Sequence, residues 1–169
     1  APLEIKLERL GGFDVTVLDS NGEPASFAEV LVSGPGVWPA RSTIADASGH
    51  ASILGLYAGV FDLRARLGDE VSPRDLNVPL PRGKIVERTL ALETGRFVLV
   101  NVSDGPMRAN AIEPPPIKDA DVVLVEEGLS SFPLVGKTND KGAVLLGPIS
   151  LGPVSVSADR TRIAGLGSF

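Results

Sequence analysis

The sequence predicts an all-β protein made of two antiparallel β-sandwiches in tandem, each of the seven-stranded type. Three observations carry this prediction: short segments alternate apolar and polar residues, turn-forming residues separate them, and one long pattern occurs twice. The chain of 169 residues holds 19 Gly and 14 Pro, which interrupt it at the spacing typical of sandwich strands. Few segments have a helical period, so an α/β arrangement is disfavoured.

The strands are expected where the alternation is clearest. Phe13–Leu18 places Phe13, Val15 and Val17 on one face, and Ala28–Val32 alternates in the same way. Each such strand would bury one face against a facing sheet. The same pattern predicts strands at Glu4–Glu8, Arg41–Ala45, Ala51–Leu54, Val60–Leu67, Ile85–Leu92, Arg96–Val102, Ala120–Val125, Ala143–Leu146 and Val154–Ala158.

Turn-forming residues lie between these strands. Asp19–Gly22, Asp46–Gly49 and Asn139–Gly142 each begin with a side chain that can accept backbone hydrogen bonds. Each ends with a glycine, which adopts positive φ without steric cost. The sequence therefore predicts three tight turns of the same kind.

A repeated pattern divides the chain. A looser copy of Thr43–Leu63 returns at Lys137–Val156, and the glycines of the two copies are 93 residues apart. Leu7–Asp19 likewise resembles Leu92–Asp104. This resemblance matches Phe13 with Phe97, which is 84 residues later. The difference between the two offsets predicts an insertion in the second copy. The expected organisation is a first sandwich at 1–94 with a leading strand at 3–8, and a second at 95–169 with a proline-rich insert at 107–118.

Composition narrows the classes of function. A net charge of −5 and a pI near 4.9 give no basic surface for nucleic acid or anionic lipid. The absence of cysteine removes disulfides, thiolate metal sites and cysteine nucleophiles. No stretch has about 18 consecutive apolar residues, so no membrane-spanning segment is expected. We expect a globular chain whose partners are proteins, including copies of itself, rather than nucleic acid.

The turns and strands of the first copy resemble a known family. Residues 19–24 (DSNGEP), 43–51 (TIADASGHA) and 54–65 (LGLYAGVFDLRA) are similar to the carboxypeptidase regulatory-like repeat, a prealbumin-like or transthyretin-like sandwich. They are also similar to the B-type repeats of bacterial surface adhesins. The resemblance covers Phe13–Glu93 well and Phe97–Ala158 less well. It implies a non-enzymatic module that spaces, braces or presents other domains in a periplasmic, cell-surface, secreted or virion-like assembly.

The chain departs from two branches of these relatives. The hydroxyisourate-hydrolysing branch uses several histidines and ends Tyr-Arg-Gly-Ser, whereas this chain has one histidine, His50, and ends Gly-Leu-Gly-Ser-Phe. Adhesin repeats often join a first-strand Lys to a last-strand Asn, and neither Phe13–Leu18 nor Ile85–Leu92 supplies that pair. We therefore expect neither the hydrolase activity nor the crosslink.

No residue type occurs at a spacing that indicates catalysis or metal binding. His50 follows a turn glycine with no nucleophile or acid at a recognisable spacing, so a solvent-facing histidine is expected. Asp19–Glu23 has oxygen ligands at alternate positions, but it lacks the bidentate glutamate that completes a calcium loop. We expect no catalytic residue, cofactor or metal.

Two segments are candidates for partner binding. Trp38 and Pro39 lie in the Gly- and Pro-rich stretch GPGVWPA, expected to be a loop. Trp38 could stack on a sugar or a protein partner, or it could cover the end of its own sandwich. The nearby aromatic residues Tyr57 and Phe61 are assigned instead to the core and its rim.

The second candidate is the run of three prolines at Pro114, Pro115 and Pro116. It is expected to be extended and outside any sheet interior, and it therefore offers a second surface.

The two ends of the chain hold one further candidate. Residues 3–8 (LEIKLE) place Leu3, Ile5 and Leu7 on one face and resemble the closing strand at Thr89–Glu93. The second sandwich, in contrast, is expected to lack its closing strand. Either the chain is a segment of a longer array, or the leading strand of one subunit completes the second sandwich of the next by strand addition. A glycan- or calcium-dependent binding module that uses the Trp38 loop is the alternative function.

Overall fold

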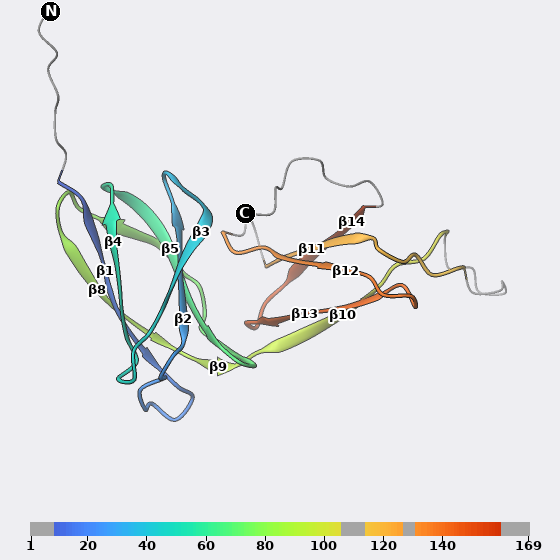
Figure 1. The fold of residues 1–169 in the computed structure, drawn as a ribbon, viewed down its shortest axis with the longest axis horizontal. Helices are drawn as coiled ribbons and strands as arrows, with labels where there is room; N and C mark the ends of the chain where they lie inside the picture. The colour runs from blue at the N-terminus through green and yellow to red at the C-terminus, as the bar shows by residue number, and fades with distance from the viewer. Residues whose placement is uncertain (1–8, 106–113, 127–130, 160–169) are drawn as a thin grey trace, which may run out of the picture. The chain divides into compact units, whose positions relative to one another are not determined.

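The computed structural model describes residues 9–105, 114–126 and 131–159, and every regular element in this part of the chain is a β-strand (Figure 1). The all-β sandwich predicted from the sequence is confirmed. The chain separates into two compact units, Ala1–Gly95 and Arg96–Phe169. The strand expected at Glu4–Glu8 and most of the insert at 107–118 lie outside the described residues.

The first unit is a two-layer sandwich. One sheet has the order β4-β1-β8; the other has the order β3-β2-β5-β6-β9, with β7 also paired to β5. Strand β8 runs parallel to β1, whereas the sequence predicted antiparallel sheets throughout. The chain changes sheets between β7 and β8, so no tight hairpin constrains the direction of β8. The bounds are β1 Gly11–Leu18, β2 Glu29–Gly34, β3 Val37–Ile44, β4 His50–Leu56, β5 Gly59–Leu67, β6 Glu70–Val71, β7 Asp75–Leu80, β8 Ile85–Ala91 and β9 Glu93–Thr94.

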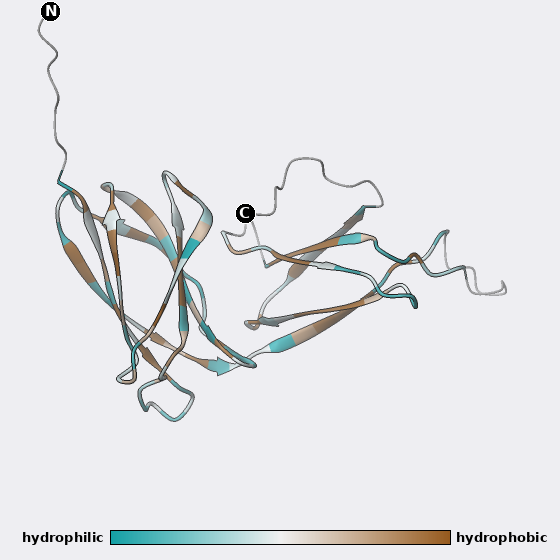
Figure 2. Ribbon diagram, in the orientation of Figure 1, coloured by the Kyte–Doolittle hydropathy of each residue, from teal (hydrophilic) through white to brown (hydrophobic). Residues whose placement is uncertain are grey.

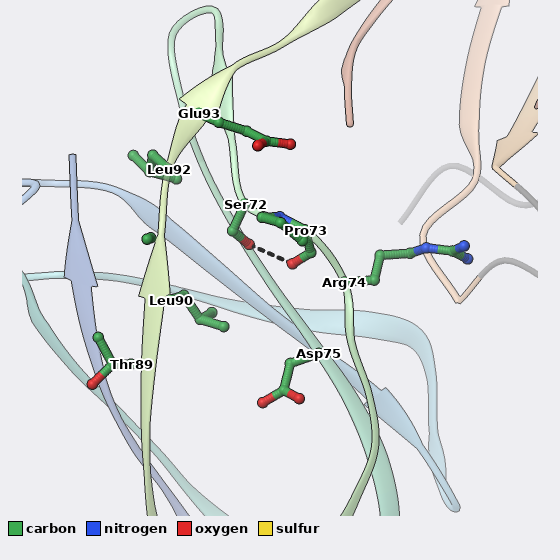
Figure 3. A pocket seen from close by; sticks show the side chains of 9 residues that line it. Ser72, Pro73, Arg74, Asp75, Thr89, Leu90, Leu92 and Glu93 are labelled. Atoms are coloured by element: carbon green, nitrogen blue, oxygen red, sulfur yellow. Dashed lines mark hydrogen bonds between the residues drawn. The ribbon is translucent and has the colours of Figure 1, made fainter. Parts of the chain in front are cut away.

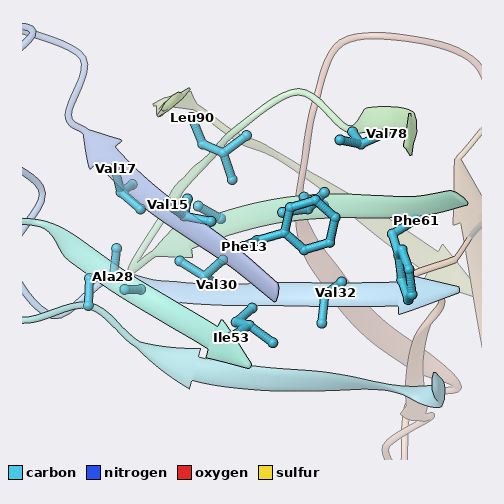
Figure 4. Close-up of a cluster of buried hydrophobic side chains, with 14 of the residues drawn as sticks. Phe13, Val15, Val17, Ala28, Val30, Val32, Ile53, Phe61, Val78 and Leu90 are labelled. Atoms are coloured by element: carbon cyan, nitrogen blue, oxygen red, sulfur yellow. The ribbon is translucent and has the colours of Figure 1, made fainter. Parts of the chain in front are cut away.

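The core of this sandwich lies between its two sheets (Figure 4). Alternate residues of β1, β2 and β5 point inward because side chains alternate between the faces of a strand. Phe13 and Phe61 meet edge to face, with ring centroids 5.7 Å apart. Both rings are almost completely removed from solvent.

Two strands that contain proline extend beyond the predicted elements. Strand β3 begins at Val37 and includes Trp38 and Pro39, which the sequence assigned to a loop. Strand β7 contains Pro79 and was not predicted. Both strands lie at a sheet edge, where proline can replace a residue whose N–H would otherwise face away from the partner strand.

The second unit is a smaller sandwich. Strands β10 and β13 form one sheet, and the other has the order β12-β11-β14. Its buried core consists of Val122, Leu124, Leu146 and Ile149. Strand β12 was not predicted, and its four residues are too few to show a clear alternation. The bounds are β10 Arg96–Asn101, β11 Asp121–Glu126, β12 Leu134–Lys137, β13 Ala143–Ile149 and β14 Val154–Asp159.

The register of the two units shows which residues correspond. The amide of Val17 donates to the Gly49 carbonyl at 2.7 Å, and the amide of Val102 donates to the Gly142 carbonyl at 2.8 Å. Val17 therefore corresponds to Val102, and the offset between β1 and β10 is 85 residues. The match of Phe13 with Phe97, at an offset of 84, is wrong by one residue. Because faces alternate along a strand, Phe13 is buried whereas Phe97 is 47% exposed on the outer face.

The proline run also has a counterpart in the first unit. Pro24 bridges to Leu18 at the end of β1, and Pro116 bridges to Ser103 just beyond the end of β10. The amide of Asp104 donates to the Pro115 carbonyl at 3.0 Å, as the amide of Asp19 does to the Glu23 carbonyl at 2.7 Å. Pro115 and Pro116 therefore belong to the repeated module, and the additional residues of the second copy precede them.

Candidate interaction surfaces

The three predicted turns use one arrangement of hydrogen bonds. An oxygen of Asp46 accepts the amides of Ser48 and His50 at 2.8 and 3.0 Å, and the Ser48 hydroxyl at 2.6 Å. These bonds, that of the Ser48 side chain foremost, lower the pKa of Asp46 below its ordinary value. The side-chain oxygen of Asn139 accepts the corresponding amides of Lys141 and Ala143 at 2.9 and 3.1 Å. The neutral amide of Asn139 thus accepts the same two backbone hydrogen bonds as the carboxylate of Asp46. The role of these side chains is therefore to stabilise the turns.

The Asp19 turn, considered above as the start of a calcium loop, has the same structure. One oxygen of Asp19 accepts the amides of Asn21 and Glu23 at 2.8 and 2.9 Å. The bond from Glu23 is the main cause of the lowered pKa of Asp19. No group of three or more acidic or histidine side chains that could hold a metal ion occurs in the described ranges.

An apolar tip is formed where the β2–β3 and β4–β5 turns meet. Pro35 lies close to Gly59, because a Cβ built on that glycine would be 3.2 Å from the Pro35 Cγ. Trp38 is 62% exposed and Tyr57 is 58% exposed. The structure thus leaves Trp38 uncovered at the start of β3. Of the two residues that the sequence assigned to the core and its rim, Tyr57 is exposed at the β4–β5 turn. Phe61, in contrast, is buried as expected.

A groove of about 450 Å³ opens between β7 and β8, where the two sheets of the first sandwich separate (Figure 3). Leu90 and Leu92 line its apolar part, and Arg74 and Glu93 are among its polar residues. The Ser72 hydroxyl donates to the Pro73 carbonyl and accepts the amide of Ala65, both at 2.9 Å. That hydroxyl therefore stabilises the backbone where the chain enters β7.

Among the described residues, the second sandwich has an open side that the first does not have. Strand β14 pairs with β11 as β5 pairs with β2, so that Val156 lies opposite Leu124 as Leu63 lies opposite Val32. Leu63 is fully buried, whereas Val156 is 42% exposed although it belongs to the inward face. In the first unit, β7, β8 and the residue that follows β8 complete the core with Val78, Leu80, Leu90 and Leu92. No counterpart of either strand occurs among the residues that the structure describes in the second unit.

The outer faces of the two equivalent sheets differ in chemistry. In the first unit, Asp14 lies opposite Ser52 and accepts a 2.6 Å hydrogen bond from its hydroxyl. At the corresponding positions of the second unit, Leu99 lies opposite Leu145, and they are 62% and 60% exposed. Figure 2 shows β10 and β13 as predominantly hydrophobic ribbons. An apolar pair thus occupies the place of a polar one.

Phe97 extends this apolar face. It lies over Gly147, because a Cβ built on that glycine would be 2.6 Å from the Phe97 Cδ1. In the first unit the large residue is on the other strand of the pair: Leu54 of β4 lies over Gly12 of β1, and a Cβ built on Gly12 would be 2.8 Å from the Leu54 Cδ2. We call Phe97, Leu99 and Leu145 the outer apolar face of the second sandwich. The sequence prediction missed it, although residues 97–101 (FVLVN) differ visibly from the equivalent residues 12–16 (GFDVT) at the outward positions.

The other predicted candidates are dispersed. Pro114, Pro115 and Pro116 lie at the far end of β10, where two of them take part in the turn described above. Leu3, Ile5 and Leu7 lie outside the described residues. His50 is exposed at the start of β4, as predicted. Trp38 and Pro39 belong to the first sandwich, whereas the three prolines belong to the second.

Comparison with known proteins does not identify a family for this chain. No family model and no curated protein matches the chain. Solved structures with similarity include the Bacillus anthracis TIE protein, at 16% identity over 89% of this chain with a TM-score of 0.43. A streptococcal ancillary pilin matches 89% of the chain at 11% identity and a TM-score of 0.40. A leucine-rich repeat protein from Bacteroides thetaiotaomicron matches 88% at 14% identity and a TM-score of 0.38.

The chain spans 28%, 53% and 23% of the length of these three proteins, respectively. Within the described ranges there is no helix of the length and apolar character needed to cross a membrane.

Proposed function

We propose that the chain is a non-enzymatic structural module of an extracellular, envelope-associated or virion-like assembly, which it joins through protein contacts of its second sandwich. The observation that carries the proposal is the contrast between equivalent positions of the two units. Leu99 and Leu145 are exposed where Asp14 and Ser52 form a polar pair, and inward-facing Val156 is exposed where Leu63 is buried.

Exposed apolar surface of this kind favours association. Transfer of Leu99 and Leu145 from water into a contact would contribute about 1–2 kcal/mol each, given that more than half of each side chain is now exposed. Exposed strand edges also offer unpaired backbone groups to another strand. Among the described residues, the edge of β10 that faces away from β13 pairs with no strand. Both features lie on one sheet and suit a protein partner, including a second copy.

Sedimentation velocity over a range of concentrations tests this proposal. The average mass of the wild-type chain is expected to rise with concentration. The double variant Leu99→Asp, Leu145→Ser introduces the polar pair of the first unit and should weaken association at least about tenfold, since the lost burial amounts to about 1.4 kcal/mol or more. Val135→Ser is the matched control, because Val135 is 57% exposed on the other sheet. A monomeric wild type, or a double variant that associates as strongly, would contradict the proposal.

A glycan- or calcium-dependent binding module is a second candidate, favoured by the exposure of Trp38 and Tyr57 at one tip. Aromatic side chains exposed together are suited to stacking on sugar rings. Trp38 is the single tryptophan of the chain, so its fluorescence reports this tip specifically. If this function is right, a member of a glycan panel or calcium will change the emission, and Tyr57→Ala will weaken the response to a glycan. Unchanged emission throughout would exclude the tip as such a site.

A further inference from the structure

The first sandwich shows which element would cover the open side of the second. Strand β8 lies parallel to β1 on the edge opposite β4, with Leu90 opposite Val17. Leu90 and Leu92 are 4% and 3% exposed and belong to the core. The amide of Leu92 donates to the Leu18 carbonyl at 2.7 Å just beyond the ladder. A parallel strand with apolar residues at alternate positions thus completes this type of sandwich.

Residues 1–8 carry the sequence of such a strand. The offset of 85 residues that relates β1 to β10 also relates residues 1–8 to residues 86–93. It matches Ile5 with Leu90, Leu7 with Leu92 and Glu8 with Glu93. The segment that leads into the first sandwich therefore resembles the closing strand that leads into the second.

At one inward-facing position, residues 1–8 and residues 86–93 differ in chemistry, and this difference also suits the second sandwich. The same offset matches Leu3 with Arg88, which lies opposite Val15 and forms an ion pair with Asp75 of β7 at 3.3 Å. The described part of the second unit has no counterpart of β7 to supply that carboxylate. An apolar residue at this position needs no such partner, because it would lie beside Val100 and the exposed inward face of β14.

We propose, on the basis of the protein contact proposed above, that residues 3–8 of a second copy of this chain bind as a parallel strand along the free edge at Val100–Ser103, which is the end of β10 and the two residues that follow it. Ile5 lies opposite Val102 and Leu3 opposite Val100, and the charged Glu4 and Lys6 face solvent.

The contact is head-to-tail, because residues 3–8 precede the first sandwich and β10 belongs to the second. In one chain, the closing strand β8 is followed directly by β9 and β10. In the proposed contact, residues 3–8 of the second copy are followed directly by its β1. In both cases the strand that completes one sandwich continues directly into the first strand of the next. Copies therefore assemble into an open chain, unless the rotation between successive copies closes a ring.

The absence of cysteine allows the register to be tested by disulfide crosslinking. Glu4→Cys with Asn101→Cys places two cysteines at positions equivalent to Thr89 and Thr16, which are directly paired in the first unit. On oxidation this variant should form a ladder of crosslinked multimers. Glu4→Cys with Val135→Cys is the control, because Val135 lies on the other sheet, and it should form none. A crosslink within single chains, or equal ladders for both variants, would overturn the proposal.

Substitutions in residues 3–8 distinguish this inference from the proposed function, which requires only a protein contact of the second sandwich. Ile5→Asp should weaken association at least tenfold in sedimentation velocity, whereas Lys6→Asp, which adds the same residue on the opposite face, should change it less than threefold. A labelled peptide of residues 1–10 should bind a chain that lacks residues 1–8. If both substitutions and the deletion leave association unchanged while Leu99→Asp, Leu145→Ser abolishes it, residues 3–8 are not the ligand and the proposed function stands. If the wild type is monomeric, both proposals fail.

Discussion

Phe13→Ala is expected to destabilise the first sandwich by about 3–5 kcal/mol, the range for removing a large buried aromatic side chain. Phe13 is fully buried at the centre of the core and packs edge to face on Phe61. The substitution leaves a cavity between the two sheets, because the surrounding strands are held by their ladders and cannot collapse into it. Differential scanning calorimetry should show a large fall in the Tm of the first unit.

Phe97→Ala is the matched control, since the repeat in the sequence pairs these two phenylalanines. Phe97 is 47% exposed on the outer face, so its removal should cost less than about 1 kcal/mol. Equal losses for the two variants would show that the one-residue difference in register is wrong.

Gly49→Ala and Gly142→Ala are expected to cost about 2–3 kcal/mol or more, each in its own sandwich. Both glycines have positive φ, 74° and 69°. A Cβ would lie 2.6 Å from the Val17 carbonyl oxygen at Gly49, and 2.5 Å from the Val102 carbonyl oxygen at Gly142. The strain of positive φ is thus increased by a contact with backbone, which cannot move without breaking the first strand of the unit.

Gly22→Ala isolates the contribution of φ alone. Gly22 has φ 84° with no atom near its Cβ position, so only the conformational cost of about 1 kcal/mol is expected. Urea unfolding of the three variants checks the order. A loss for Gly22→Ala as large as that for Gly49→Ala would contradict the role assigned to the carbonyl contact.

Much of the fold could be predicted because each buried strand carries its own periodic signal. The alternation around Val15 and Val30 identified β1 and β2, and the turn at Asp46 was recognised from a side chain and a glycine at the right spacing. Strands β3 and β7 were misjudged or missed, because Pro39 and Pro79 are compatible with a strand only at a sheet edge. Edge positions are a property of the assembled sheet, so local sequence cannot reveal them.

The candidate surfaces were predicted less completely. Trp38 was recognised as a candidate from its flanking prolines, but the exposure of Trp38 and of Tyr57 depends on how their strands and turns pack. The outer apolar face was missed because an apolar residue in a strand is ordinarily assigned to the core. Only the pairing of Leu99 with Leu145, opposite the buried face, shows that these side chains point outward.

The sequence by itself determined the all-β class, the repeat and the turns, because period-two alternation and turn chemistry are local properties of a chain. The tertiary structure alone decided which face each residue occupies and which sandwich has an open side in the part of the chain that the structure describes. The reason is geometric: a shift of one residue exchanges the two faces of a strand, so an alignment that is nearly right can still place Phe97 in a core it does not enter.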